Sequence, residues 1–198
     1  MSKGHLTKSI EIVPCDARWP VEFRDIGAPL REALGGLALR IDHIGSTSVP
    51  GLAAKDVIDI QVTVAALDAE TLAGALAPLG YTLYQPVDHD HVPPGHDEPP
   101  EEWRKLFFRP PEGQRRTNLH IRKAGRANQR YALLFRDYLR VDPQSRGAYQ
   151  QIKEALARLH PDDVDAYYDV KDPVCDIVMA AAERWAAQTS YVPGPSDL

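Results

Sequence analysis

The stretch IDHIGSTSVPGLAAKDVIDIQV, residues 41–62, decides the fold of this 198-residue chain. A β-rich run at 39–44 ends at Gly45, and a turn-forming segment leads from there to a second β-branched run at 57–64. Asp59 lies among apolar neighbours in this second run. The pattern predicts two strands joined by a tight bend, with one carboxylate on the second strand.

The bend carries groups that bind anions. Gly45 lets the backbone approach a ligand closely, and Ser46 and Thr47 add hydroxyl groups. We therefore predict that Gly45, Ser46 and Thr47 form a phosphate cradle and that Asp59 is a metal-binding, catalytic carboxylate beside it. The alternative is an ordinary tight turn followed by an Asp that pairs locally.

Ordered motifs continue downstream, and together with residues 41–62 they resemble the signature of the GrpB family. The motifs are NLHI at 118–121, LFRDYLR at 134–140, the run 149–156 and the pair at 168 and 171. The resemblance covers about residues 9–187. It implies a nucleotidyltransferase-like fold: an α+β protein with a small mixed sheet flanked by helices and a helical C-terminal third packed on it.

Length and composition fit one domain. We predict a single domain over 1–188, with a sheet-forming part at about 9–125, a helical part at about 126–188 and a disordered tail at 189–198. The chain has no run of 18 apolar residues, its first ten residues lack the apolar core of a signal peptide, and its two cysteines have no metal-like spacing. We expect a cytoplasmic protein that does not associate with membranes; the oligomeric state is left open.

The predicted helical part contains three helices. The apolar stripe of the first stops at Asp142-Pro143, and the second stops at Pro161. Asp172 and Pro173 have the composition of an N-cap and first turn, so the third helix is expected to begin there. Residues 10–13 are expected to form a short strand, and 103–109 and 117–123 a hairpin.

Positive charge is concentrated in one part of an otherwise acidic chain. The net charge is −5, yet residues 103–140 hold eleven Lys and Arg against two acids. A local basic stripe favours a small phosphorylated ligand over a nucleic-acid polymer, which usually requires a broad positive surface. The predicted phosphate ligands are Lys55, Arg116, Arg122, Arg136 and Arg140; the alternative is that such arginines pair with acids elsewhere in the fold.

The metal site is incomplete in the sequence. The nucleotidyltransferase pattern has two acids at i and i+2 of a strand, which place both carboxylates on one face, but Gln61 stands two residues after Asp59. His43 and His120 are the candidates for completing a site for Mg²⁺, Mn²⁺ or a softer ion such as Zn²⁺. The segment 89–98, with three histidines and three acids, is either a mobile flap or a second metal site.

Three functions remain open at this point. The first is metal-dependent transfer of a nucleotidyl group to a small acceptor. The second is a non-catalytic module that binds a nucleotide or a coenzyme-A precursor, since related domains are fused to dephospho-coenzyme A kinases. The third is a histidine-dependent metal hydrolase. Gln61 weakens the first without affecting the second.

Overall fold

The computed structural model describes residues 9–198 and contains a five-stranded mixed sheet. The strand order is β1-β2-β5-β4-β3, with β2 and β5 parallel and the other pairs antiparallel. The strands are β1 (Ala38–Ile44), β2 (Ile58–Val64), β3 (Thr82–Leu83), β4 (Lys105–Arg109) and β5 (Thr117–Lys123). The first eight residues of the predicted domain lie outside the described part of the chain.

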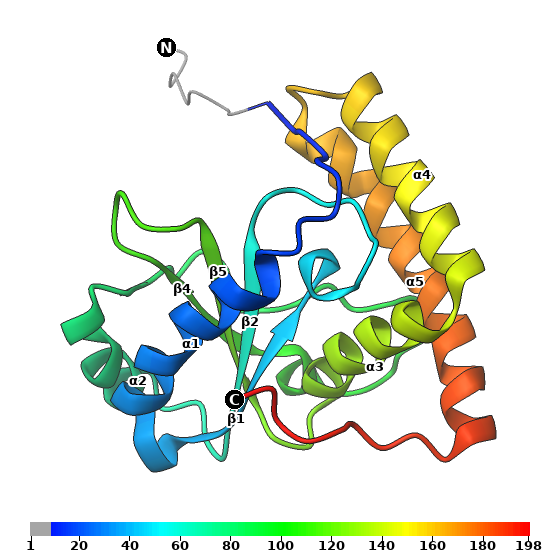
Figure 1. Cartoon of the computed structure of the whole chain (residues 1–198). Coiled ribbons are helices and arrows are strands. Elements are labelled where there is room, and N and C mark those ends of the chain that lie inside the picture. The colour runs from blue at the N-terminus through cyan, green and yellow to red at the C-terminus, as the bar shows by residue number, and fades with distance from the viewer. Residues whose placement is uncertain (1–8) are drawn as a thin grey trace.

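Five α-helices surround the sheet (Figure 1). Helices α1 (Trp19–Leu34) and α2 (Ala69–Leu76) cover one face, and α3 (Ala127–Val141), α4 (Pro143–Leu159) and α5 (Val164–Thr189) form the C-terminal helical part. Short 3₁₀ turns are η1 (Gly35–Leu37), η2 (Ser46–Ser48), η3 (Ala77–Leu79) and η4 (Pro100–Trp103). The predicted α+β class, with a mixed sheet and a helical C-terminal third, is confirmed.

The alternation of side chains along β2 sets the two faces of the sheet. Ile58, Ile60 and Val62 are fully buried and pack in the same core cluster as Phe23 and Leu30 of α1. Because neighbouring strand residues point to opposite faces, the intervening residues of β2 point away from α1, toward the helical part. The apolar core therefore holds one side of β2 and leaves the other for polar side chains.

A second core ties the bend after β1 to the helical part. Val49 and Leu52, in the connection from β1 to β2, are buried with Leu134 of α3, Tyr149 of α4 and Met179 of α5. The bend is thus held between the sheet and the three helices.

The prediction for the start of the last helix was wrong. Asp142 does cap α4, accepting a hydrogen bond from Ser145 N at 2.7 Å, but α5 begins at Val164 and contains Pro173. The carboxylate of Asp163 caps α5 by accepting from Ala166 N at 2.9 Å, and Tyr167 in the first turns is fully buried. A good cap and a buried aromatic ring offset the loss of one helical hydrogen bond at the proline.

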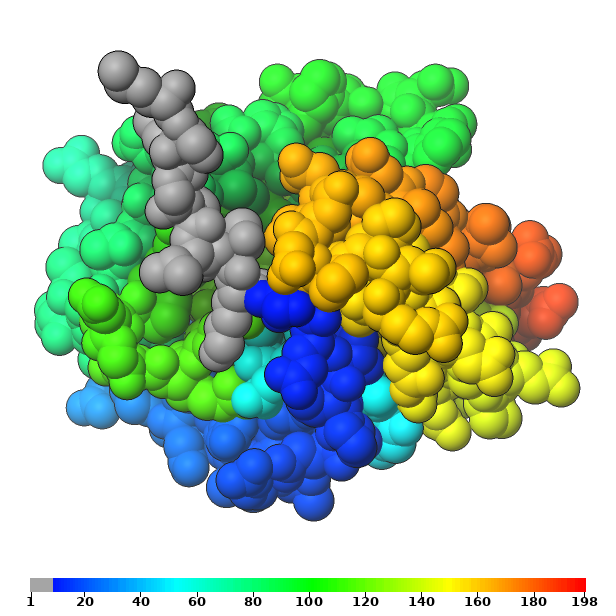
Figure 2. Space-filling model, turned by 90° about the horizontal axis from the view of Figure 1, so that it is seen from above, coloured from blue at the N-terminus to red at the C-terminus, as the bar shows by residue number. Residues whose placement is uncertain are grey.

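The N-terminal segment is also less regular than predicted. Residues 10–13 form no strand but a single β-bridge, between Val13 and Ala54. Seen from above, this segment (dark blue) lies against the turn between α4 and α5 (Figure 2), where Ile10 N donates to Pro161 O at 2.6 Å. It therefore joins the sheet-forming and helical parts.

The tail predicted to be disordered instead packs along β1. Ser196 Oγ accepts a hydrogen bond from Ile41 N at 2.8 Å, and Asp197 Oδ2 accepts from His43 N at 2.9 Å. β1 is an edge strand with unpaired N–H groups, and the tail's polar side chains satisfy them. Nothing in the Pro-, Gly- and Ser-rich composition of the tail indicates this docking.

In residues 9–198, no helix combines the length and apolarity needed to cross a membrane.

Candidate functional site

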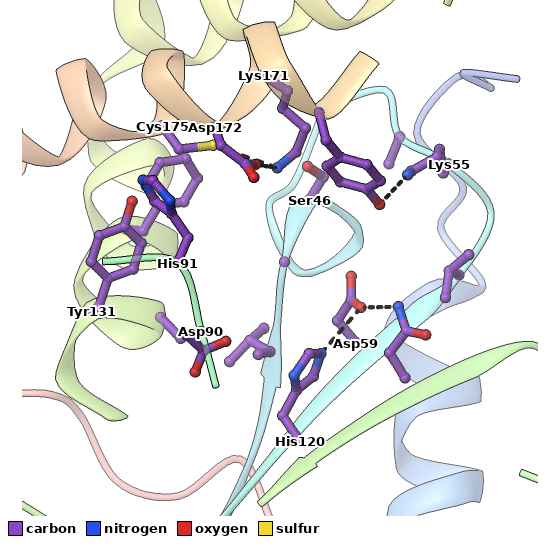
Figure 3. A pocket seen from close by; sticks show the side chains of 18 of the residues that line it. Ser46, Lys55, Asp59, Asp90, His91, His120, Tyr131, Lys171, Asp172 and Cys175 are labelled. Atoms are coloured by element: carbon purple, nitrogen blue, oxygen red, sulfur yellow. Dashed lines mark hydrogen bonds and ion pairs between the residues drawn. The ribbon is translucent and has the colours of Figure 1, made fainter. Parts of the chain in front are cut away.

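A cavity of about 440 Å³ lies between the polar face of the sheet and the helical part (Figure 3). Its walls come from the bend after β1, from β2 and β5, from the segment between β3 and β4, and from α3, α4 and α5. Of the predicted site residues, it brings together Gly45, Ser46, Thr47, Lys55, Asp59, Arg116, His120 and Arg122.

Gly45 and Asp59 are in direct contact at the bend. Gly45 has φ 70° and ψ −174°, a conformation that side-chain-bearing residues rarely adopt. A Cβ at this position would lie 2.4 Å from Asp59 Oδ2. Only glycine allows the backbone of the bend to lie against this carboxylate, so the bend and Asp59 form one side of the cavity.

The carboxylate of Asp59 is held by β5. The parallel register places Asp59 beside Asn118, and Asn118 Nδ2 donates to Asp59 Oδ1 at 2.8 Å. His120 Nε2 lies 3.9 Å from the same oxygen. Both contacts involve Oδ1, which leaves Oδ2 facing Gly45.

Burial and neighbours set the protonation of this pair. Burial raises the pKa of Asp59, but His120 and Asn118 outweigh it and hold the pKa below the usual range, so the carboxylate is ionised. Burial lowers the pKa of His120 to about 4, so the imidazole is neutral at pH 7. A carboxylate beside a neutral imidazole is a combination that can bind a divalent cation.

Gln61 cannot contribute to such a site as it stands. It shares the face of Asp59, but its Oε1 accepts from Arg122 at 2.7 Å and its Nε2 donates to Gln129 O at 3.1 Å. Both ends of the amide are therefore engaged in the structure.

A second carboxylate reaches the cavity from the segment between β3 and β4. Asp90 accepts hydrogen bonds from Lys105 (2.6 Å), Arg122 (2.8 and 2.9 Å) and Asn128 (3.0 Å). Burial opposes ionisation, but Arg122 and Lys105 hold the pKa of Asp90 far below its usual range. The predicted mobile flap is thus anchored at Asp90, and Arg122 is neutralised by protein rather than free for phosphate.

Three lysines gather around Ser46 at the other end of the cavity. Lys153, which is 2% exposed, donates to Ser46 Oγ at 2.9 Å and to Ala53 O at 2.6 Å. Lys55 donates to Tyr168 OH at 2.7 Å, and the ring of Tyr168 also lies 5.3 Å from Lys171 Nζ. Lys153 and Lys171 are not among the predicted phosphate ligands, because in the sequence each is as consistent with a plain surface lysine on a later helix as with a ligand.

Aromatic side chains form the wall opposite the sheet. The rings of Tyr131 and Phe135, one turn apart on α3, are stacked with centroids 6.2 Å apart. Trp103 meets Tyr131 edge-on at 6.1 Å, and Tyr149 meets Phe135 edge-on at 5.5 Å. All four residues line the cavity, which therefore has a cationic end at Ser46 and an aromatic wall.

Several predicted ligands are not in the cavity. His43 faces α1, where its ring stacks on Phe23 at 4.8 Å and its Nε2 pairs with Thr47 Oγ1 at 3.0 Å. Strand alternation explains this, since His43 pairs with Ile60 on the face opposite Asp59. His43 is therefore no partner of Asp59 and His120 in a metal site. Thr47 does line the cavity, but its hydroxyl donates to Val57 O, and this hydrogen bond shapes the bend.

Arg136 and Arg140 were expected to bind phosphate but have structural contacts. Arg136 is 3% exposed and donates to His43 O (3.0 Å) and to Asp197 (2.8 Å). Arg140 donates to Ser48 O at 2.9 and 3.1 Å. They support the bend and the tail from outside the cavity. For these arginines the alternative given by the sequence holds, namely that the basic residues pair with groups elsewhere in the fold. Other Lys and Arg residues of 103–140 form ion pairs with Asp90, Glu22, Asp56 and Glu183.

The histidine-rich segment does not assemble a metal site. His89, His91 and His96 pair with three separate carboxylates, those of Asp88, Asp176 and Glu98. No group of three or more His, Cys, Asp or Glu side chains within 9–198 is arranged to hold a metal. The donors at Asp59 and His120 fit one cation completed by ligand and water oxygens; they do not fit a two-metal carboxylate centre.

Comparison with known proteins was made on sequence and on structure. Residues 9–181 match the family described as GrpB protein. The chain is 37% identical to a dephospho-CoA kinase of Mycolicibacterium paratuberculosis, and the match covers 93% of the chain but 48% of that protein. It is also 37% identical to a UPF0157 protein of Pseudomonas aeruginosa, over 96% of the chain and 76% of that protein. The chain thus spans about half the length of the dephospho-CoA kinases that it matches. The crystal structure of conserved protein GrpB from Enterococcus faecalis superposes with a TM-score of 0.71 at 28% identity, covering 88% of this chain and 99% of that one.

Proposed function

The chain belongs to the GrpB family, and we propose that its cavity binds a nucleotide or another phosphorylated small molecule within a nucleotidyltransferase-like fold. The observation that carries this proposal is Lys153. A buried ammonium group is costly unless an anion accompanies it, and its partners here are a hydroxyl and a carbonyl oxygen.

The cationic end supplies the phosphate subsite. Ser46 and Lys153 meet there, Lys55 and Lys171 flank them, and the exposed Arg116 also lines the cavity. Hydrogen bonds from ammonium and guanidinium groups to phosphate are short and strong. A phosphate placed at Ser46 would offset the burial of Lys153.

The aromatic wall suits the ring of a nucleotide. Tyr131 is half-buried and forms part of the cavity lining together with Phe135 and Trp103. Binding sites for small molecules combine such apolar walls with a few placed polar groups, as here. A small molecule fits a cavity of this size. A nucleic-acid polymer would need a continuous basic surface, and this chain lacks one in residues 9–198 because many of its basic residues are engaged in internal ion pairs.

A divalent cation, Mg²⁺ or Mn²⁺, would be held by Asp59 with His120. When bound, it would neutralise charge on the phosphates. The chain's own residues would position the ligand: Asn118 fixes the orientation of Asp59, and Gly45 keeps the bend close to it.

Transfer of a nucleotidyl group to a small acceptor is the second candidate. The ionised Asp59, with Oδ2 beside the bend, favours it. Gln61 and the pairing of Asp90 with arginine and lysine weigh against it, because the site then offers one free carboxylate. Binding is therefore the primary proposal. The names of the mycobacterial relatives make coenzyme-A precursors worth testing alongside nucleotides.

A thermal-shift panel tests this function. Nucleoside triphosphates, coenzyme A and its precursors are added with and without Mn²⁺, and the matching nucleosides serve as ligand controls. We expect a rise in Tm with a phosphorylated ligand, reduced in Ser46→Ala and, for the Mn²⁺-dependent part, in Asp59→Asn. Asp25→Asn, at an exposed position of α1, is the matched control. Absence of any shift across the panel would contradict the proposal.

A further inference from the structure

Lys153 differs from the other buried cations of the protein. Lys105 and Arg122 bond to Asp90, and Arg136 bonds to Asp137 and Asp197. Lys153 forms no salt bridge with any residue between 9 and 198, although it is as deeply buried as these. The face of the Tyr149 ring also lies close to it, with the ring centroid 4.8 Å from Nζ.

The surroundings of Lys153 add positive charge instead of neutralising it. Lys55 and Lys171 lie at the same end of the cavity as Ser46 (Figure 3). Their ammonium groups are 4.5 and 5.3 Å from the ring centroid of Tyr168. In the described part of the chain, the carboxylate that pairs with a member of this cluster is Asp172, 3.2 Å from Lys171 Nζ. Fully protonated, the three lysines would thus exceed the paired carboxylate by about two charges.

We propose that this end of the cavity selects ligands with a terminal phosphate, and that one proton is taken up on Lys153 when such a ligand binds. The inference rests on the proposed function, because it concerns the same cavity. It adds the class of ligand: a phosphomonoester or the free end of a polyphosphate chain, as opposed to a phosphodiester or a capped chain.

Charge matching is the first reason. A terminal phosphate carries between about −1.5 and −2 at pH 7, because its second pKa is near 6. A bridging phosphate carries a single charge and offers fewer oxygens. The lysine cluster has an excess of about two positive charges and offers donors at Ser46, Lys55 and Lys171. A terminal phosphate balances this charge, whereas a bridging phosphate does not.

The protonation state of Lys153 before a ligand binds is the second reason. Burial, and next the charge of Lys171, lower the pKa of Lys153 to about 7. The other groups facing it are Tyr149 and Glu154 of α4, Cys175 of α5, and Lys55. Above neutral pH the empty cavity therefore holds largely neutral Lys153, and an incoming dianion restores its proton.

Isothermal titration calorimetry at pH ~8 tests both parts, because Lys153 of the empty site is then mostly neutral. ATP is compared with diadenosine triphosphate, and UTP with diuridine triphosphate, since the capped compounds share the base and the chain of three phosphates but lack a free end. Coenzyme A and dephospho-coenzyme A form a third pair that differs by one phosphomonoester. Each titration is repeated in two buffers of different ionisation enthalpy, so that the difference in heat reports protons taken up.

We expect the ligand with the free phosphate to bind at least tenfold more tightly than its capped partner and to take up close to one proton. Its affinity should fall by up to tenfold per pH unit above pH ~7. Lys153→Met should abolish the uptake and most of the preference. Lys55→Met, which removes a partly exposed member of the cluster, should weaken binding but keep the uptake.

The outcomes separate the two proposals. If none of the six compounds binds, the proposed function fails, and this inference with it. If they bind but capped and free ligands have equal affinity, or the heat is the same in both buffers, the inference is overturned while the proposed function stands. Because the wild-type measurements alone decide this, the result does not depend on the folding of the variants.

Discussion

Gly45→Ala is the substitution for which the structure gives the clearest energetic expectation. The residue has φ 70° and ψ −174°, a region occupied almost only by glycine. The added methyl group would lie 2.4 Å from Asp59 Oδ2 and 3.0 Å from Asp59 Cβ. The Cβ belongs to β2, which is paired on both sides within the sheet and cannot retreat, so either the bend or the carboxylate must move.

Two contributions give the magnitude. Holding alanine in this backbone conformation costs about 1–3 kcal/mol. Rotating the Asp59 carboxylate away breaks its hydrogen bond from Asn118 and adds about 1–2 kcal/mol. We therefore expect Gly45→Ala to lower the free energy of unfolding by roughly 2–5 kcal/mol.

Gly51→Ala provides the matched control. Gly51 also has a positive φ, 78°, but a Cβ there would meet nothing within 4 Å. Its cost should be the backbone term alone, about 1–2 kcal/mol. Urea unfolding of both variants, followed by circular dichroism, isolates the contact with Asp59 as the difference between them. Equal destabilisation of the two variants would refute the close contact on which the site geometry depends.

Further expectations separate structural from ligand-binding charges. Arg136→Ala should lower stability by about 2–3 kcal/mol, because it removes the hydrogen bonds of a buried guanidinium to Asp137, to Asp197 and to His43 O. The nucleotide affinity of the folded fraction should stay unchanged. Arg116→Ala should change stability by less than about 0.5 kcal/mol and weaken affinity at least several-fold, as calorimetry would show. Asp90→Asn should cost about 3–5 kcal/mol in urea unfolding because it leaves two buried cations uncompensated; a neutral effect would mean that the segment between β3 and β4 is not anchored there. Burial lowers the pKa of both His43 and His120 to about 4, whereas an unfolded histidine has a pKa of about 6.5. The unfolded chain therefore binds more protons between these values, so the free energy of unfolding should decrease as the pH falls from about 6.5 to 4. His43→Gln should flatten this part of the plot of stability against pH. An unchanged plot would show that His43 is not buried in its neutral form.

The parts of the fold that could be predicted from sequence are those set by local pattern. The apolar spacing along α1 and the β-branched runs on both sides of Gly45 identify their elements by periodicity alone. The bend was predictable because glycine is required for its φ. Asp142-Pro143 marked a helix boundary correctly, since the cap and the proline act within one turn.

Features that depend on partners distant in sequence could not be predicted. Arg122, Arg136 and Arg140 are indistinguishable from phosphate-binding arginines until the fold shows which acids and carbonyls they meet. His43 is two residues from Gly45, but strand alternation turns it to the opposite face. Lys153 becomes notable only when α4 packs against the bend, and its missing carboxylate partner cannot be read from a sequence.

The same reasoning explains the two errors in the helical part and the tail. Asp172-Pro173 resembles a helix start more closely than Asp163 does, yet the burial of Tyr167 extends α5 across the proline. The tail has the composition of a disordered segment, and its order comes from the unpaired edge of β1, which supplies N–H groups to Ser196 and Asp197.

A crystal structure of the protein grown with ATP and Mn²⁺ tests the central claim most directly. If the account is right, electron density for a phosphate group will lie within hydrogen-bonding distance of Ser46 Oγ and Lys153 Nζ, with the metal at Asp59. Phosphate density on Arg136 and Arg140 instead, or a cavity left empty by a nucleotide that binds in solution, would contradict it.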